Sequence, residues 1–394
     1  MWVVKENNDK LRICVATSTR ADWGLLEPLA RCLRSATGVE LLIVATNMHL
    51  MPQFGMTVDE ITEAGFEVAA RVPMEAEGDT EASRVRAMAC CMAGMADALE
   101  RLHPDVLIVL GDRYEMLAVA SAAAVMHVPI VHIAGGEISE GANDDSFRHA
   151  ISKLSTLHLT ATEPYRRRVI QMGEEPDRVV NTGAIGVWNA LNITPLPVAD
   201  LEAFLNFKIE GERVAIVTYH PATNETELTP AEATRQLLAA LDAFPELKCV
   251  ITYPNNDAGG ASIIRLIEEY AAAHPDRVRA VPSLGMRRYH SLLRHAALVV
   301  GNSSSGIVEV PSYGIPTVDV GIRQRGRLAA PSVIHCGVRT PQITEAIAEA
   351  LASDFNGVEN PYYKPDTLRL MADAVLEFAA GLPARPKHFY DLKQ

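Results

Sequence analysis

Carboxylate side chains gather in one stretch of the chain, IVHIAGGEISEGANDDSFRH, residues 130–149. It opens as a short apolar strand and breaks at two glycines, and Glu137, Asp144 and Asp145 come after that break. Asp112 likewise follows an apolar run directly. Each aspartate alone could simply cap the start of a helix, but one cap suffices and two adjacent acids exceed that need. Several carboxyl groups near one sheet edge could give or take protons from a ligand bound there, so these four are the candidate catalytic acids.

A second chemical signal is the stretch GNSSSGIVEVPSYGIPTVDVGIRQRGR, residues 301–327. We expect its first six residues to form a small-residue loop that enters a helix, where serine hydroxyls and backbone N–H groups would bind a diphosphate. A glutamate placed near that helix start could accept hydrogen bonds from both ribose hydroxyls, and two arginines add positive charge. The predicted nucleotide-binding residues of this stretch are Ser303, Ser304, Ser305, Gly306, Glu309, Arg323 and Arg327. Neither a G-x-G-x-x-G after the first strand nor a G-x-x-x-x-G-K-[ST] is present, so the sequence supports neither a dinucleotide fold nor a P-loop.

Four further polar residues follow other strand-like runs. Arg20 could bind an anion at a helix entrance, or lie in solvent beside an N-capping hydroxyl. Arg113, next to Asp112, adds positive charge. His220 could orient a diphosphate and aid its departure, although a lone histidine at a strand end is more often structural. Asn255 could hydrogen-bond a base or a sugar, or belong to a plain turn.

Short apolar runs alternate with helical patterns, such as 25–34 and 81–102, along nearly the whole chain. Continuous apolar runs are typical of strands buried on both faces, and their alternation with helices predicts βαβ units and parallel sheets. The sequence therefore predicts an α/β fold with two Rossmann-like parallel-sheet domains facing a cleft. The runs span 11–17, 39–46, 105–112 and 129–135, and then 214–220, 248–254, 278–284, 297–303 and 316–321.

A polar, proline-marked stretch at residues 191–204 separates the two halves. We expect an N-terminal Rossmann-like domain over 1–195 that carries the catalytic acids and a C-terminal Rossmann-like nucleotide-binding domain over 196–370. A C-terminal helix and tail, 371–394, would pack back on the first domain. Because ligands bind beyond the carboxyl ends of strands in such sheets, residues at those ends are the ones to examine.

Composition narrows the class of protein. The chain has 394 residues and a formal net charge of −13, which argues against binding to nucleic acid or to an anionic membrane. No apolar run approaches the length of a membrane span, and the N-terminus lacks a signal-peptide pattern. The six cysteines form no C-x-x-C pair, and Cys14 and Cys249 lie within apolar strand patterns typical of core thiols. We expect a cytoplasmic protein without disulfides, metal or cofactor.

The motifs resemble those of the hydrolysing UDP-N-acetylglucosamine 2-epimerases of sialic-acid and legionaminic-acid biosynthesis. The matching pieces recur in the family's order over about residues 11–330. Two positions depart from the pattern, Ala134 before the Gly-Gly-Glu and Ile322 where GDRQ is usual, and both bear on substrate preference. The matching pieces are STRADWGLL, GDRYE, HIAGGEISEGANDDSFRHAISKLS, NTGAIGVWN, YHPAT, PNND and the serine-rich stretch described above.

The resemblance implies a fold like that of the GT-B glycosyltransferases and a reaction in two halves. Loss of the C2 proton and of the nucleoside diphosphate gives a 2-acetamidoglycal. Addition of water and return of a proton to the other face of C2 then give free N-acetylmannosamine or a relative. We expect Asp112 and Glu137 to transfer the C2 protons, with Asp144 or Asp145 assisting, and the sequence leaves open which is acid and which is base.

Several alternatives stay open at the level of sequence. The nucleotide could be UDP or GDP, and the sugar could be N-acetylglucosamine or N,N'-diacetylbacillosamine. A non-hydrolysing epimerase, a GT-B glycosyltransferase and a nucleotide-sugar sensor are the competing functions. The expected partners are a small nucleotide sugar and further copies of the chain, as a homodimer or homotetramer.

Overall fold

The computed structural model describes residues 10–75, 78, 80–222, 224, 227–254, 259–382 and 386–392. The chain forms two compact units. Unit 1 comprises residues 1–137, 144–185 and 364–394, and unit 2 comprises 138–143 and 186–363. The short segment 138–143 thus packs with the second unit although unit 1 supplies the chain on both sides of it.

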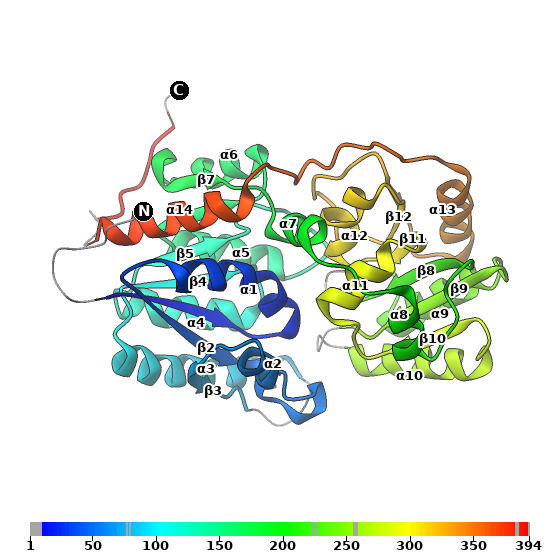
Figure 1. Cartoon of the computed structure of the whole chain (residues 1–394), viewed down its shortest axis with the longest axis horizontal. Helices are drawn as coiled ribbons and strands as arrows, with labels where there is room; N and C mark the ends of the chain where they lie inside the picture. Colours follow the sequence, from blue (N-terminus) through cyan, green and yellow to red (C-terminus); the bar gives the residue numbers. More distant parts are fainter. Residues whose placement is uncertain are drawn as a thin grey trace. The chain divides into compact units, whose positions relative to one another are not determined.

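Unit 1 is built on a seven-stranded sheet with the order β3-β2-β1-β4-β5-β6-β7 (Figure 1). All the strand pairs within it are parallel. The strand order reverses direction between β1 and β4, which is the topological switch point of this sheet. The strands are β1 (Leu11–Thr17), β2 (Val39–Thr46), β3 (Val68–Val72), β4 (Val106–Leu110), β5 (Ile130–Ile133), β6 (Leu157–Thr160) and β7 (Val179–Asn181).

Helices cover the sheet of unit 1. Helices α3, α4 and α5 pack in sequence against one another, and α14, from the C-terminal part of the chain, packs against α1. The helices are α1 (Arg20–Ser35), α2 (Val58–Glu63), α3 (Glu81–Leu102), α4 (Tyr114–Val125), α5 (Asp144–Leu154), α6 (Glu163–Gln171) and α14 (Thr367–Ala380), with 3-10 turns η1 (Asn47–Leu50), η2 (Pro52–Phe54) and η3 (Pro176–Arg178).

Unit 2 is built on a six-stranded parallel sheet with the order β10-β9-β8-β11-β12-β13, and its switch point lies between β8 and β11. The strands are β8 (Arg213–Thr218), β9 (Leu247–Thr252), β10 (Val278–Val281), β11 (Ala296–Gly301), β12 (Thr317–Val320) and β13 (Val333–Cys336). The helices are α7 (Ile185–Asn192), α8 (Val198–Leu205), α9 (Pro230–Leu241), α10 (Gly260–Ala273), α11 (Gly285–Leu293), α12 (Ser304–Val308) and α13 (Thr340–Ala352), with the 3-10 turn η4 (Val310–Tyr313).

The continuous apolar strands are buried on both faces, because successive side chains point to opposite sides of a sheet. In β8, Ala215 and Val217 join the core under α9, α10 and α13, whereas Val214 and Ile216 join a second core with α8 and α11. Because both faces of the sheet are covered by apolar cores, its strands contain few polar residues.

The predicted α/β fold with two parallel sheets is confirmed. Cys14 and Cys249 lie in the strand cores as expected, and burial raises the pKa of each thiol to about 12. In the described part of the chain, no helix is both long and apolar enough to cross a lipid bilayer.

Candidate functional site

The predicted acids of unit 1 lie past the carboxyl ends of β4 and β5. Asp112 follows β4, which borders the switch point of the sheet, and Glu137 follows β5, its neighbour. Asp144 and Asp145 form the first turn of α5, which comes next in the chain. The fold thus brings residues from separate motifs to one edge of one sheet, where ligands of such sheets bind.

Arg148 gathers this acidic cluster. Its side chain is 1% exposed, and its guanidinium pairs with Asp112 and with Asp145, the latter at 3.2 Å (Nη1–Oδ1). The same Nη1 donates to the backbone carbonyl of Glu137 at 3.0 Å. A buried guanidinium needs such partners, since removing one member of a buried charge set typically costs about 3–5 kcal/mol. Arg148 therefore fixes the two aspartates and the backbone of Glu137 relative to one another.

Asp112 lies one residue before the N-cap of α4, which is Arg113. Its carboxylate pairs with Arg148 from α5, so Asp112 links two helices in addition to any local contact at the start of α4.

The turn that presents Glu137 is tightly packed. Ala134 and Gly136 have positive φ angles of 67° and 81°, and a Cβ on Gly136 would lie 2.5 Å from the carbonyl oxygen of Tyr165. Arg168 donates to the carbonyl of Gly136. The Glu137 side chain itself is only 6% exposed. The turn therefore holds the Glu137 carboxylate in a nearly buried position.

His149 faces the acids from the next turn of α5. Its Nε2 lies 3.5 Å from Oδ2 of Asp145, and burial lowers its pKa, an effect that the charge of Asp145 partly offsets. At neutral pH the lowered pKa favours the neutral imidazole.

Two predicted anion-binding arginines, Arg20 and Arg113, also lie in unit 1. Arg20 forms an ion pair with Glu60, and Arg113 Nε lies 2.6 Å from Oε1 of the buried Glu115. Near the Arg113–Glu115 pair, the Asp22 carboxylate accepts a hydrogen bond from the Ser18 hydroxyl (2.6 Å), and burial raises the pKa of Asp22. Each arginine thus has a carboxylate partner within its own unit, and their predicted role with the nucleotide stays a prediction.

In unit 2, His220 and the serine stretch meet at the switch point between β8 and β11. The Asn302 side chain accepts from the backbone N–H of His220 (2.7 Å) and donates to its carbonyl (2.8 Å), which joins the ends of the two strands. Gly301 has φ of 135°, and a Cβ there would lie 1.9 Å from the carbonyl oxygen of Thr218, so only glycine fits. Asn302 is a residue that the sequence analysis missed, because a two-pronged contact with a distant backbone leaves no sequence pattern.

The serine stretch begins its helix earlier than expected. Ser303 is the N-cap of α12, so Ser304, Ser305 and Gly306 lie in the helix rather than in a preceding loop. Glu309 follows the end of this short helix, and its carboxylate accepts a hydrogen bond from Ser305. The expected loop through Gly306 is wrong, and this glycine serves packing instead, because a Cβ there would lie 2.7 Å from Cγ2 of Thr317 in β12.

Glu309 and Ser305 belong to a polar group that other elements support. The hydroxyls of Ser305 and Tyr289 are hydrogen-bonded at 2.8 Å. A Cβ at Gly186 would lie 2.3 Å from Oε1 of Glu309, so the glycine leaves the space that this carboxylate occupies.

The two predicted arginines of unit 2 lie near the same strand ends. Arg323 donates to the carbonyl of Asn302 at 3.0 Å, which places its guanidinium beside the start of the serine stretch. Burial raises the pKa of Asp319, and Arg323, Arg327 and His335 counteract that rise. His335 Nδ1 lies 2.9 Å from Asp319 Oδ2.

Asn255 lies outside the described residues. Among the side chains that the structure does describe, no group of three or more His, Cys, Asp or Glu residues could hold a metal ion. The remaining candidates thus form two sets, an acidic one at the strand ends of unit 1 and a serine and arginine set at those of unit 2.

A family model described as UDP-N-acetylglucosamine 2-epimerase matches residues 31–376. The chain belongs to this family. This 2-epimerase family membership confirms the resemblance drawn from the motifs and agrees with the two parallel-sheet units.

Individual members of the family are similar over most of the chain. A Campylobacter jejuni protein named GDP/UDP-N,N'-diacetylbacillosamine 2-epimerase (hydrolyzing) is 38% identical over 325 residues, 82% of this chain and 84% of that protein. A Neisseria meningitidis UDP-N-acetylglucosamine 2-epimerase is 35% identical over 339 residues, 86% and 87% of the two chains.

A crystal structure of UDP-GlcNAc 2-epimerase from Neisseria meningitidis bound to UDP-GlcNAc superposes with a TM-score of 0.76 at 17% identity, over 93% of this chain and all of that one. At that identity the likeness shows a shared fold.

Proposed function

We propose that the protein is a hydrolysing 2-epimerase that converts a nucleoside-diphospho-N-acetylhexosamine, UDP-N-acetylglucosamine in the first instance, to free N-acetylmannosamine and nucleoside diphosphate. The observation that carries this proposal is the acidic cluster that Arg148 holds together in a member of the 2-epimerase family. The name of the Campylobacter jejuni relative supports the hydrolysing type.

The acids of unit 1 would act on the sugar. The C2 proton becomes removable only as the C1–O bond breaks and positive charge grows on the ring, and nearby carboxylates stabilise that charge. In the first half, one carboxylate takes the C2 proton, the C–H electrons form the C1=C2 bond, and the diphosphate leaves with the C1–O electrons. In the second half, water adds its oxygen to C1 and loses one proton to a carboxylate, while an acid delivers a proton to the opposite face of C2, where the C1=C2 electrons form the new C–H bond. Glu137 and Asp112 are the proposed proton-transfer residues, with Asp144 or Asp145 assisting.

The groups of unit 2 would bind the nucleotide. Ser303, Ser304 and the guanidinium of Arg323 suit a diphosphate, which needs N–H and O–H donors and positive charge. Glu309, held by Ser305, suits the ribose hydroxyls. The backbone clamp from Asn302 gives His220 a fixed position from which to orient the diphosphate.

A second candidate differs only in the substrate. The Campylobacter jejuni relative is named for N,N'-diacetylbacillosamine carried on GDP or UDP. The same acids would serve that sugar, because it keeps the C1 and C2 centres at which the chemistry occurs.

One incubation in D₂O tests both proposals. The protein is mixed with UDP-N-acetylglucosamine or with the nucleotide-linked diacetylbacillosamine, and products are followed by ¹H and ³¹P NMR. We expect free nucleoside diphosphate and a free 2-epimerised sugar that carries deuterium at C2. An epimerised sugar still attached to its nucleotide would refute the hydrolysing assignment, and transfer only to an added acceptor would refute the epimerase.

We also propose that copies of the chain associate. Helix α3 exposes apolar side chains, with Val85 66% and Met92 38% exposed, and such an uncovered helix face suits a second copy of the same surface.

A further inference from the structure

The C-terminal segment 386–392 contacts unit 1 at the end of α5 that lies away from the acids. The Tyr390 N–H donates to the carbonyl of Gly173 at 2.9 Å, and the Phe389 ring occupies the space where a Cβ on Gly173 would lie. Lys153, in the last turn of α5, lies with its Nζ 5.0 Å from the centre of the Phe389 ring. The segment thus packs against the part of unit 1 that holds the catalytic candidates.

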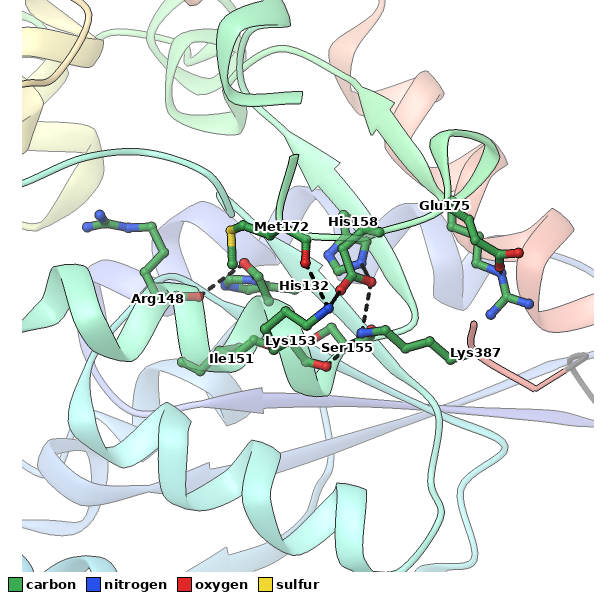
Figure 2. A network of polar contacts seen from close by, with 12 residues as sticks. His132, Arg148, Ile151, Lys153, Ser155, His158, Met172, Glu175 and Lys387 are labelled. Atoms are coloured by element: carbon green, nitrogen blue, oxygen red, sulfur yellow. Dashed lines mark hydrogen bonds and ion pairs between the residues drawn. The ribbon is translucent and has the colours of Figure 1, made fainter. Parts of the chain in front are cut away.

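Glu174 is the centre of this docking. Its side chain is 3% exposed and meets Lys153 Nζ at 2.6 Å, His158 Nε2 at 3.0 Å and Lys387 Nζ at 2.8 Å. Figure 2 shows Lys153, His158 and Lys387 pointing toward one another from three separate parts of the chain. Burial alone would raise the pKa of Glu174, but these three partners outweigh it and lower the pKa to about 2. The carboxylate is therefore ionised throughout the physiological pH range and holds the segment in place.

Lys387 also caps α5. Its ammonium donates to the carbonyls of Lys153 (2.6 Å) and Ser155 (2.8 Å), in addition to its pair with Glu174. The last carbonyls of a helix have no partner within the helix, and a cation there satisfies them and interacts favourably with the helix dipole. With three acceptors, every N–H donor of the ammonium group has a partner.

The other end and the middle of α5 connect to the acids. Its first turn contains Asp144 and Asp145, and its buried Arg148 pairs with Asp112. Ser152 contacts His132 Nδ1 at 3.1 Å, and His132 Nε2 lies 2.8 Å from the carbonyl of Gly111, the residue before Asp112. Burial lowers the pKa of His132 to about 3, so the imidazole stays neutral and donates from Nε2 to that carbonyl.

We propose that Lys387 is a positioning residue for the reaction: by capping α5 and anchoring it to Glu174, it sets the placement of the helix that carries Asp144, Asp145 and Arg148. This inference rests on the proposed function of those acids. Helix α5 is about 16 Å long and transmits a shift at one end to the other as a rigid element. A misplacement of about 1 Å in a catalytic group can lower turnover by roughly 10²-fold.

The test compares Lys387→Ala, Lys387→Arg and a control, His388→Ala, in the full-length protein. His388 is the exposed neighbour of Lys387 in the same segment. Turnover and KM are measured with the nucleotide sugar that the wild type hydrolyses, UDP binding by calorimetry, and protection of α5 amides by hydrogen exchange. We expect Lys387→Ala to lower kcat about 10- to 100-fold, with UDP affinity within about twofold, and to speed exchange in α5 by about fivefold or more. Lys387→Arg, which keeps a charged donor, should recover most of the turnover, and His388→Ala should behave as wild type.

Three results would overturn the inference. One is faster hydrogen exchange in α5 of Lys387→Ala with unchanged kcat, since Lys387 would then stabilise the helix without affecting the reaction. Another is no change in either measurement. The third is a loss of UDP affinity in proportion to kcat, which would indicate general unfolding. A wild-type protein that releases no nucleoside diphosphate would instead refute the proposed function, and the exchange measurement would still report whether Lys387 holds α5.

Discussion

Glu137 is only 6% exposed, whereas the side chains of Asp112 and Asp145 are 22% and 27% exposed. The Glu137 backbone is fixed by a hydrogen bond from Arg148 to its carbonyl. Replacing the carboxylate with the amide in Glu137→Gln keeps the shape but removes the proton acceptor. We expect turnover to fall by roughly 10²-fold or more, with UDP affinity nearly unchanged. Steady-state kinetics and calorimetry with UDP measure the two quantities separately.

Glu140 provides the matched control three residues away. Its side chain is 56% exposed and lies 3.4 Å from Arg325 Nε, a surface pair of the kind that contributes about 0–1 kcal/mol. Glu140→Gln should therefore keep turnover within about twofold of the wild type. Near-normal turnover in Glu137→Gln would remove that residue from the catalytic set.

Glu309→Ala should show the reverse of Glu137→Gln. We expect UDP binding to weaken by about tenfold, because the variant loses a charged acceptor.

At the scale of elements, the close approach of β11 to β8 depends on one glycine. A Cβ at Gly301 would lie 1.9 Å from the Thr218 carbonyl oxygen, so Gly301→Ala must force the two strand ends apart. Because Asn302 and His220 lie on those ends, we expect a loss of about 3 kcal/mol or more in unfolding free energy together with weaker UDP binding. Gly211→Ala is the control, since that glycine also has positive φ (78°) but nothing within 4 Å. It should lose only about 1 kcal/mol, and equal losses in the two variants would contradict the steric explanation.

Sequence patterns predicted the inner strands better than the edges. β1 and β2 match the expected ranges 11–17 and 39–46, because strands buried on both faces leave continuous apolar runs. β3, β6, β7 and β13 were missed. β3, β7 and β13 lie at sheet edges, and an exposed charge, Arg71, interrupts β3. β6 is an inner strand that was also missed, and its His158 is fully buried with Nε2 3.0 Å from Oε2 of Glu174.

The site divides in the same way. The positions of the acids and serines near strand ends were predictable, because strand ends can be read from local sequence. Arg148 reaches Asp145 within α5, but Asp112 lies 36 positions away. The contacts of Asn302 and Lys387 were not predictable, because they join residues 82 and 234 positions apart. Such contacts exist only once the sheets have formed, and no short motif encodes them.

At the scale of the whole molecule, α3 offers a surface that matches itself. Ala89, Met92 and Ala93 are exposed along one face with Val85, at the spacing of successive helical turns. Arg86 lies five residues after the start of α3 and Asp97 five residues before its end. In the proposed dimer, two copies of α3 would pair antiparallel about a two-fold axis, and the Arg86 of each copy would face Asp97 of the other. The small alanines at the centre would let the two helices approach closely, which supports this arrangement for the proposed dimer.

Charge exchange tests this dimer. Arg86→Asp and Asp97→Arg each place like charges opposite one another across the axis and should lower the dimer fraction, measured by sedimentation equilibrium. The double variant restores opposite charges in both pairs and should recover the dimer, which two unrelated surface changes would not do. Val85→Asp should give monomer because it buries a charge against an apolar face, whereas Phe204→Asp, a change at an exposed apolar residue of unit 2, should leave the dimer intact. A double variant that dissociates further than either single variant would exclude antiparallel pairing of α3, since added disruption is the result expected if Arg86 and Asp97 make independent contacts.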